Sequence, residues 1–354
     1  MRKKRILVAP LNWGLGHASR CVPVITSLQD IGFEPIIASD GDALELLKLE
    51  FPDLTHIELP SYNIRYPNKG ENMKRKLMLE TPRILKTINQ ERKITEDLAS
   101  KLELEGIISD NRWGVRSKRL KTNVFMTHQL NVLSGSTTFL SSFIHRQYIK
   151  RFDQCWVPDF EGTENLSGIM GHPTSDPLPV KYMGVLSRLK KRELPVTYDF
   201  VVLLSGPEPQ RTKLEHILLR ELETIRSRVL FVRGKITEKK EINSRNRNIH
   251  IQNYLYGKSL EDALNSTNFV ISRPGYTTLM DLSKLEKKAF FIPTPGQPEQ
   301  EYLGRRLYQK NIAPFCKQDE FRWKKIEEIE AYQGLSDLGN SVSFQDLFAF
   351  FESE

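Results

Sequence analysis

The sequence predicts an α/β protein with two doubly wound, Rossmann-like domains, each built on a parallel sheet covered by helices on both faces. Its 354 residues suit two domains of roughly 150–190 residues each rather than one core. Short apolar runs alternate with amphipathic helical stretches along the whole chain, which is typical of parallel strands buried on both faces. Hydrophobic residues make up 39% and charged residues 27%, so we expect a folded globular protein.

The first half opens on a strand and continues in alternation. We predict strands at residues 6–9, 34–38, 106–110 and 123–126, and helices at residues 18–31, 42–49 and 81–102. Pro82 falls near the start of the last helix, where a missing N–H costs least. These elements assign residues 1–187 to an N-terminal α/β domain.

The second half repeats this order. Strands are predicted at residues 200–204, 228–232, 269–272 and 289–292, and helices at residues 212–226 and 277–285. They define a C-terminal α/β domain over residues 198–335. The charged segment 187–195, which ends in a proline, is predicted to be the linker. Residues 336–354 contain an apolar-faced helix at 344–351, and whether it packs back on the N-terminal domain stays open.

Charge and cysteine usage limit the partners and the compartment. The net charge of +8 favours anionic partners, namely nucleotide phosphates, nucleic acid or an acidic membrane surface. Cys21, Cys155 and Cys316 are widely spaced, which argues against disulfides and a zinc site and favours reduced thiols. The apolar run at residues 6–11 is too short for a signal peptide, and no apolar stretch reaches the ~18–20 residues that span a bilayer. We expect a cytoplasmic protein, with peripheral contact at the inner face of the membrane left open.

A glycine turn joins the first strand to the first helix in the sequence NWGLGH at residues 12–17. Gly14 and Gly16 let the backbone turn tightly and approach a ligand, and the helix start offers N–H groups. It differs from the dinucleotide fingerprint, because the third glycine is missing. His17 should stand at the carboxyl edge of the sheet, where an imidazole could act as general base. The alternative is a plain glycine turn with a capping or solvent-facing histidine.

Two further residues are expected at the same edge. Asp110 ends the strand at 106–110, and a carboxylate there would orient His17 and stabilise its imidazolium. His128 follows the strand at 123–126 and is a second histidine candidate. The alternatives are a turn or capping aspartate and a structural histidine.

The strongest motif in the second half is a strand, a tight glycine turn and a helix over residues 272–281. The amides at such a helix start form an anion site suited to a diphosphate, and Asp281 about one turn later could accept hydrogen bonds from ribose hydroxyls. The alternatives are helix capping by the threonines and a solvated helix face for Asp281. The candidate residues of the turn are Ser272, Arg273, Gly275, Tyr276, Thr277 and Thr278.

Two neighbouring loops add candidates. Ser205 and Gly206 could donate to phosphate with Arg211 supplying charge, although an ordinary proline-rich connection is the alternative. The loop is not a Walker loop, because the Gly-Lys-Ser/Thr ending is absent. Gln300 and Glu301 begin a later helix and could bind sugar hydroxyls.

Residues 248–307 resemble the donor-binding region of the MurG-like and UDP-glycosyltransferase families. RPGYTTLMD at 273–281 resembles their Arg-x-Gly-x-x-Thr-x-x-Glu pattern, and residues 293–300 resemble the Pro-x-x-x-x-x-x-Gln stretch that follows. GLGH at 14–17 is similar to the family's glycine turn ending in histidine. The sequence departs from the pattern at Asp281, which replaces a glutamate, and at Pro274, Gly304 and the pair Lys287 and Lys288.

The resemblance implies the GT-B fold, with two domains facing across a cleft, and an inverting glycosyltransferase that uses a nucleotide-diphosphate sugar, which we expect to be UDP-linked. It implies that Gly275 and Thr278 face the diphosphate, Asp281 the ribose, and Gln300 with Glu301 the donor sugar. It further implies that His17, partnered by Asp110, deprotonates the acceptor hydroxyl. Gly14, Gly16 and His128 are then acceptor-side candidates. The resemblance also implies that no metal is required, so we expect no metal and no cofactor besides the donor substrate.

Two other functions remain open. A non-hydrolysing UDP-sugar 2-epimerase of the same architecture would need further acid/base groups and would act without an acceptor. A non-catalytic nucleotide-sugar-binding protein would bind without transfer. The acceptor could be a small molecule, a glycan or a lipid-linked molecule, and the basic stretch 69–92 is either a solvated helix face or a patch for an anionic membrane. Nucleic acid is not an expected partner, since the basic residues lack an aromatic platform.

Overall fold

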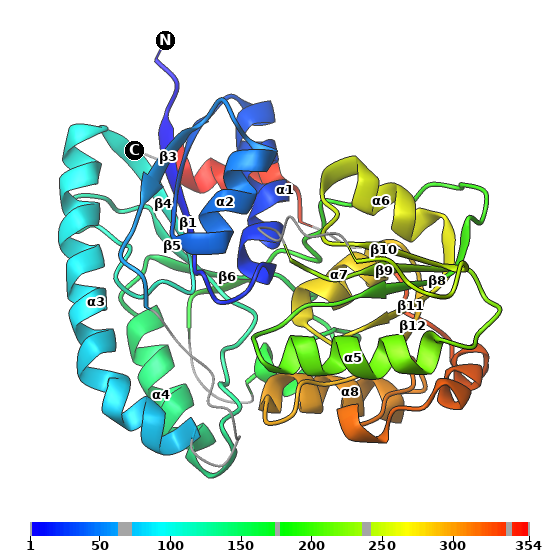
Figure 1. The fold of residues 1–354 in the computed structure, drawn as a ribbon. Helices are drawn as coiled ribbons and strands as arrows, with labels where there is room; N and C mark the ends of the chain where they lie inside the picture. Colours follow the sequence, from blue (N-terminus) through cyan, green and yellow to red (C-terminus); the bar gives the residue numbers. More distant parts are fainter. Residues whose placement is uncertain (1, 63–72, 174–177, 236–241, 338–341, 353–354) are drawn as a thin grey trace. The chain divides into compact units, whose positions relative to one another are not determined.

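The computed structural model describes residues 2–62, 73–173, 178–235, 242–337 and 342–352, with the backbone alone for residues 73–80. These residues form two compact units. Unit 1 holds the described residues up to Arg188 and again from 342, and unit 2 holds those from Leu189 to Asp337. Each unit has its own parallel sheet flanked by helices (Figure 1), which confirms the predicted fold class of two Rossmann-like domains.

The sheet of unit 1 has seven parallel strands in the order β3-β2-β1-β4-β5-β6-β7. The chain starts in the middle of the sheet, adds strands in one direction, and then crosses back to continue from β4. The central strands are buried because they are continuous apolar runs. The bounds are β1 Arg5–Pro10, β2 Glu34–Ser39, β3 Thr55–Glu58, β4 Leu104–Asp110, β5 Asn123–Met126, β6 Gln154–Val157 and β7 Val180–Tyr182.

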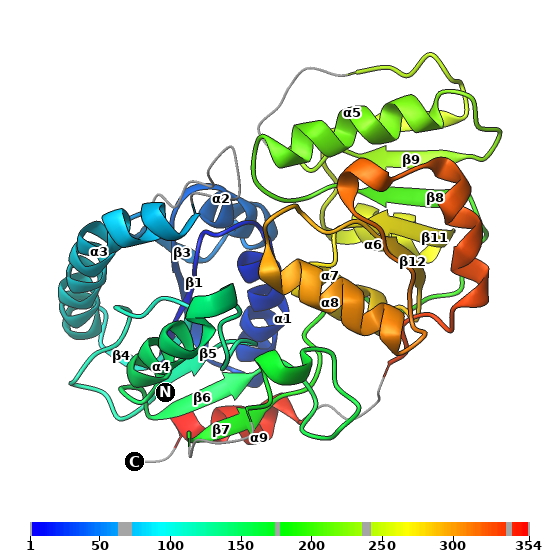
Figure 2. The same ribbon diagram turned by 90° about the horizontal axis from the view of Figure 1, so that it is seen from below.

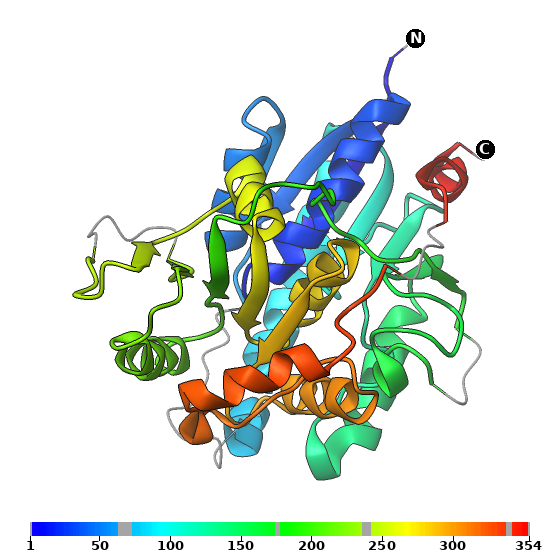
Figure 3. The ribbon, with the colours of Figure 1, turned by 90° about the vertical axis from the view of Figure 1, so that its right-hand side faces the viewer.

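Helices cover both faces of this sheet, with α1 and α2 on one face and α3 and α4 on the other (Figures 1 and 3). Their bounds are α1 Gly16–Ile31, α2 Gly41–Glu50, α3 Met73–Lys101 and α4 Thr138–Ile149. Helix α3 begins at Met73 rather than at residue 81, so Pro82 lies inside it. The sequence MKRK at its start lacks the regularly spaced apolar residues by which helices were predicted, so this part of the helix was not recognised. Residues 69–72 of the predicted basic patch lie outside the described residues.

The end of the chain belongs to unit 1. Helix α9 (Phe344–Phe348) and the 3₁₀ turn Ala349–Phe351 lie beside β6 and β7, in red in Figure 2. Phe348 and Phe351 are buried, and their rings lie 6.1 and 6.3 Å from that of Phe33. A Cβ on Gly106 of β4 would lie 2.4 Å from the Phe351 ring, so this ring occupies the space of the missing side chain.

The sheet of unit 2 has five parallel strands in the order β10-β9-β8-β11-β12, the same sequence of crossovers as the first five strands of unit 1. Its strands are β8 Tyr198–Leu203, β9 Val229–Val232, β10 Ile249–Gln252, β11 Thr267–Ser272 and β12 Lys288–Phe291. Its helices are α5 Gln210–Leu222, α6 Gly257–Asn265, α7 Tyr276–Lys284 and α8 Pro298–Gln309, followed by the 3₁₀ segments Gln318–Glu320 and Trp323–Ala331.

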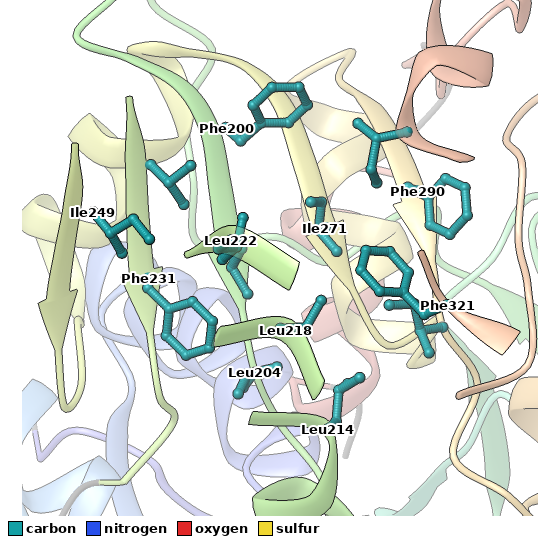
Figure 4. Packing of buried hydrophobic residues seen from close by; sticks show 14 of the residues in the cluster. Phe200, Leu204, Leu214, Leu218, Leu222, Phe231, Ile249, Ile271, Phe290 and Phe321 are labelled. Carbon is teal, nitrogen blue, oxygen red and sulfur yellow. The ribbon is translucent and has the colours of Figure 1, made fainter. Parts of the chain in front are cut away.

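The core of unit 2 is formed where α5 packs on the sheet. Leu214, Leu218 and Leu222 recur every fourth residue, so they share one helix face. Figure 4 shows them lying over Phe231 and Ile271 of the strands. This packing holds the carboxyl ends of β8 and β11 in place, where the loops of the candidate site begin.

Part of the predicted linker is fixed to unit 2. The backbone N–H of Lys190 donates to Glu261 Oε2 at 2.8 Å, and that of Arg192 donates to Asn265 Oδ1 at 2.8 Å. The Arg192 guanidinium also donates to Glu261 Oε1 at 2.9 Å. Unit 2 therefore begins at Leu189 instead of residue 198, because polar side chains of α6 bind this segment.

Candidate functional site

The predicted site residues gather at the point of each sheet where the strand order reverses. In unit 1, Pro10 at the end of β1 is in register with Asp110 at the end of β4. In unit 2, Leu203 at the end of β8 is in register with Ser272 at the end of β11. Loops after such strand pairs leave the sheet in opposite directions, and ligands of open α/β sheets bind in the crevice between them.

In unit 1 the glycine turn delivers a histidine to this edge. Gly14 has φ +80°, a conformation that favours glycine. The N–H of Leu11 donates to Asp110 O at 2.9 Å, which attaches the start of the turn to β4. Helix α1 begins at Gly16, two residues before the predicted start at 18, so His17 lies in its first turn. His17 Nδ1 lies 3.0 Å from Asp110 Oδ1.

A buried arginine, which the sequence analysis missed, completes this cluster. Arg20 lies one turn after His17 on α1 and is 1% exposed. Its Nε donates to Asp110 Oδ2 at 2.6 Å, and its Nη2 donates to Asp110 Oδ1. Its Nη1 lies 2.7 Å from Nδ1 of His128. The i,i+3 spacing of His17 and Arg20 places both side chains on one helix face, and this spacing was the available signal.

The cluster sets the charge states that acid/base chemistry needs. Burial opposes ionisation of Asp110, but the Arg20 guanidinium and His17 hold the pKa of this carboxyl well below its usual range. Burial lowers the pKa of His17 below 6.5, Asp110 works in the opposite direction, and Arg20 lowers this pKa further. At neutral pH the pair is therefore a neutral imidazole beside a carboxylate, which is the resting state of a general base.

In unit 2 the predicted anion site is the turn into α7. Gly275 is the N-cap, with φ −72° and ψ 140°, and it has no side chain that could accept from the first-turn amides. The N-terminus of a helix carries partial positive charge and exposes N–H groups, which suits a phosphate. Ser272 and Tyr276 are buried, whereas Thr277, Thr278 and Asp281 are partly exposed.

Two other loops end near this turn. Ser205 and Gly206 are exposed in the loop after β8. A Cβ on Gly206 would lie 3.6 Å from Thr294 Oγ1, so this loop adjoins the one after β12. Thr294 is 2% exposed, and its Oγ1 has no hydrogen-bond partner among the described residues. We add Thr294 as a site candidate that no sequence motif indicated.

Arg273 has a different environment from the one expected. It is fully buried, and its Nη1 donates to the backbone oxygens of Ile292 and Pro293 at 2.8 Å each. Its Nη2 donates to Gln210 O at 3.2 Å and to Gln318 Oε1. Burial lowers the pKa of Arg273 to about 9. The guanidinium therefore ties loops together behind the Gly275 turn, instead of reaching out to a ligand.

Arg211 also has partners inside unit 2, which corrects the prediction that it supplies charge to a phosphate. Its Nε donates to Glu208 Oε1 at 2.7 Å, and its Nη1 donates to Glu215 and to Arg233 O. The sequence placed Arg211 correctly at the start of a helix, but it could not indicate the buried carboxylate of Glu215 one turn later as its partner.

Gln300 and Glu301 contact the backbone of the loop that precedes them. Gln300 Oε1 accepts from the N–H of Thr294 at 2.8 Å, and Glu301 Oε1 accepts from that of Gly296 at 3.0 Å. These bonds shape the loop at residues 293–297. Contact of either residue with a sugar stays a prediction.

The residues that the structure describes were searched for a metal site and for a membrane-spanning helix. Within them, no group of three or more His, Cys, Asp or Glu side chains is placed to hold a metal ion. Every helix in the same ranges is too short or too polar to cross a lipid bilayer.

Comparison with known proteins points to one class of enzyme. Residues 210–331 match the family model of the glycosyltransferase family 28 C-terminal domain. The uncharacterized glycosyltransferase MK0977 of Methanopyrus kandleri is 22% identical over 324 residues, covering 85% of this chain and 89% of the relative.

Solved structures extend the likeness to the whole fold. Acinetobacter baumannii MurG is similar with a TM-score of 0.54 and 11% identity, covering 99% of both chains. A UDP-glucosyltransferase from Polygonum tinctorium has a TM-score of 0.61 and 12% identity, covering 100% of this chain and 99% of the other. At such low identity these matches bear on the fold alone.

The fold and the family match together define the class: the chain is a glycosyltransferase with the GT-B fold. Within that class it resembles MurG and the UDP-glycosyltransferases, as the motifs at 14–17 and 273–281 predicted. Its reaction is the transfer of a sugar.

Proposed function

We propose that this enzyme is an inverting glycosyltransferase that takes a sugar from a UDP sugar and attaches it to an acceptor hydroxyl. The observation that carries the proposal is the Gly275 turn, which presents the N-terminus of α7 beside the β8–β11 reversal. A diphosphate carries the charge that this helix end favours. The similarity to the UDP-glucosyltransferase from Polygonum tinctorium supports a UDP-linked donor.

The donor contacts in this proposal are those that the resemblance to the MurG-like and UDP-glycosyltransferase families implies. The diphosphate accepts hydrogen bonds from the amides near Gly275 and Thr278, the ribose binds Asp281, and the sugar binds Gln300 and Glu301. Arg273 contributes through its charge and makes no direct contact with the donor. Its hydrogen-bond partners are neutral oxygens, so they do not neutralise the positive charge of the guanidinium. The result is a positive potential where the leaving group gains negative charge.

The chemistry at the acceptor uses the unit 1 cluster. His17 Nε2 removes the proton of the acceptor hydroxyl while its oxygen attacks the anomeric carbon from the face opposite the diphosphate. The bond from that carbon to the diphosphate oxygen breaks, and UDP leaves with the electron pair, so the anomeric configuration inverts. Asp110 stabilises the imidazolium that forms. This scheme requires no metal ion and no cofactor.

Helix α4 favours an apolar or lipid-linked acceptor at the inner face of a membrane. Phe139 and Leu140 are 81% and 58% exposed, and Phe143 and Ile144 follow one turn later on the same helix face. Lys150 and Arg151, which are exposed at the end of this helix, would contact anionic headgroups. We expect the protein to be cytoplasmic and to co-sediment with vesicles containing an anionic phospholipid; its recovery in the supernatant would contradict membrane contact.

A nucleotide screen with a designed variant tests the donor site. UDP should raise the melting temperature, since a ligand at a hundredfold excess over Kd adds about 2.7 kcal/mol. In Gly275→Val, the φ of −72° accepts a side chain, and its Cβ meets only Thr278 Oγ1, at 3.8 Å. The added methyl groups cover the amides, so UDP affinity should fall at least about tenfold, equal to ~1.4 kcal/mol.

The matched control is Gly162→Val, because a Cβ at Gly162 meets nothing within 4 Å. It should bind UDP like the unchanged protein. A screen in which no nucleotide or nucleotide sugar shifts the melting temperature contradicts the proposal, as does undiminished UDP affinity in Gly275→Val.

Two other functions predict different products. A 2-epimerase would convert a UDP sugar without an acceptor, and a binding protein would retain UDP affinity without turnover. The cluster around His17 contains a single carboxylate, Asp110. Sugar transfer needs one general base, whereas epimerisation needs several acid/base groups, so the cluster favours transfer.

A further inference from the structure

The two histidines near Asp110 have different partners, although the sequence suggested both for the site. His17 Nδ1 lies near Asp110 and Arg20, whereas His128 Nδ1 lies near Arg20. We propose that Arg20 is a positioning residue that assigns different roles to them: it holds Nδ1 of His128 as a hydrogen-bond acceptor, and it holds Asp110 so that His17 alone acts as base. This inference rests on the function proposed above.

The role of His128 follows from hydrogen-bond chemistry. A guanidinium has donors only, so at 2.7 Å from Arg20 Nη1 the Nδ1 of His128 must be the acceptor. The ring proton of His128 then lies on Nε2. Nδ1 of His128 is therefore occupied by Arg20, and its Nε2 lies 3.5 Å from Nε2 of Gln129.

The role of His17 follows from a competition at one atom. Its Nδ1 lies 3.0 Å from Asp110 Oδ1 and 2.9 Å from Arg20 Nη2, and it cannot donate to the first and accept from the second at once. Arg20 already donates to both carboxylate oxygens through Nε and Nη2, which fixes the plane of the carboxylate. Since Asp110 is ionised, we infer that Nδ1 carries the proton and donates to it. The lone pair then sits on Nε2, ready for the acceptor hydroxyl.

The positive charge of Arg20 also sets the pH range of the base. The charged or titratable groups around His17 are Asp110 from β4, Arg20 from its own helix and His128 from the loop after β5, with Cys21 Sγ 3.7 Å from Asp110 Oδ2. Burial disfavours the imidazolium most, Asp110 favours it, and Arg20 disfavours it further. Arg20 therefore keeps His17 neutral, and able to accept a proton, at a lower pH than burial and Asp110 would permit without it.

The tautomers are measured first, on the full chain and without any substrate. A long-range ¹H–¹⁵N correlation spectrum of ¹⁵N-histidine-labelled protein, assigned with His17→Gln and His128→Gln, should show Nδ1–H for His17 and Nε2–H for His128. The opposite tautomer at either ring overturns the proposal. This measurement uses no Arg20 variant, so it tests the proposal even if such a variant fails to fold.

The pKa of His17 is measured next, by NMR titration of Arg20→Met and Arg20→Lys. Burial lowers the pKa of His17 most, Asp110 raises it and Arg20 lowers it. Removing the positive charge takes away one of the two lowering effects, so this pKa should rise by about one pH unit or more in Arg20→Met and less in Arg20→Lys. The control is Arg112→Met, since Arg112 is another fully buried arginine of unit 1, paired with Asp40 and Glu91. An unchanged His17 titration in Arg20→Met overturns the proposal, as does an equal rise in Arg112→Met.

Activity supplies the last readout. The acid limb of the pH profile of kcat/KM for sugar transfer should move to higher pH in Arg20→Met, with the KM for the UDP sugar unchanged, and Arg20→Lys should restore part of the original profile. A purely structural role would lower activity at every pH without moving the limb, and this result would overturn the proposal. If the tautomers and the titration agree but no UDP sugar is turned over, the function proposed above fails and the assignment of Arg20 stands.

Discussion

Replacing His17 with alanine should lower kcat/KM for sugar transfer about 10²–10⁴-fold, the usual contribution of a general base. The acceptor hydroxyl would lose the imidazole that takes its proton. We expect no substitution by His128, because its Nδ1 is occupied by Arg20. Binding of UDP should be unchanged, since the proposed donor contacts are made by other residues. Initial rates of UDP release measure kcat/KM, and thermal shift with UDP measures UDP binding.

The control for this experiment is His216→Ala, which removes an exposed histidine from α5. Its rate should match that of the unchanged enzyme. Full activity in His17→Ala would rule out His17 as the base. Loss of UDP binding together with activity would mean that the substitution disturbs more than the proton transfer.

Replacing Phe351 with alanine should lower the free energy of unfolding by about 3–5 kcal/mol, the usual cost of deleting a buried aromatic ring. Phe351 is 2% exposed and lies close to the side chains of Phe33 and Trp156. The space that it fills is the one left by Gly106 in the middle of the sheet, so neighbouring side chains have little means to close the cavity. Urea-induced unfolding measures the change.

Phe139→Ala is the matched control, because Phe139 is 81% exposed. It should change the free energy of unfolding by less than about 0.5 kcal/mol. A loss of under about 1 kcal/mol in Phe351→Ala would mean that the end of the chain contributes little to the stability of unit 1.

Much of the fold could be predicted from local patterns. The strands β1, β4, β8 and β11 are apolar runs, and each was predicted within one or two residues of its bounds. Strands β3, β6, β7 and β10 were not predicted. They have three or four residues each, and the edge strands β3, β7 and β10 keep exposed side chains, so an apolar run does not mark them. Their pairing with neighbouring strands decides their conformation.

The candidate site was predictable in its turns and in the pairing of His17 with Asp110, but not in the partners of its arginines. Residues 14–17 and 272–278 carry the glycines and the strand–helix order that identify a turn, and the structure has a helix beginning at Gly16 and another at Tyr276. Arg211 looked like a phosphate ligand and Arg273 like a donor-site residue because a motif shows a charged residue without its partners. Arg20 was missed because its partners, Asp110 and His128, are far from it in the sequence.

The sequence by itself determined the alternation of strands and helices and the glycine turns at their junctions, because hydrophobic periodicity and backbone freedom are local properties. Tertiary structure alone decided which partners the buried arginines have. Arg20 pairs with Asp110, which is 90 positions away, and with His128, which is 108 positions away, and only the parallel order of β1, β4 and β5 brings them together. Once buried there, these groups bind one another because water no longer solvates them, and this mutual binding sets the protonation of His17.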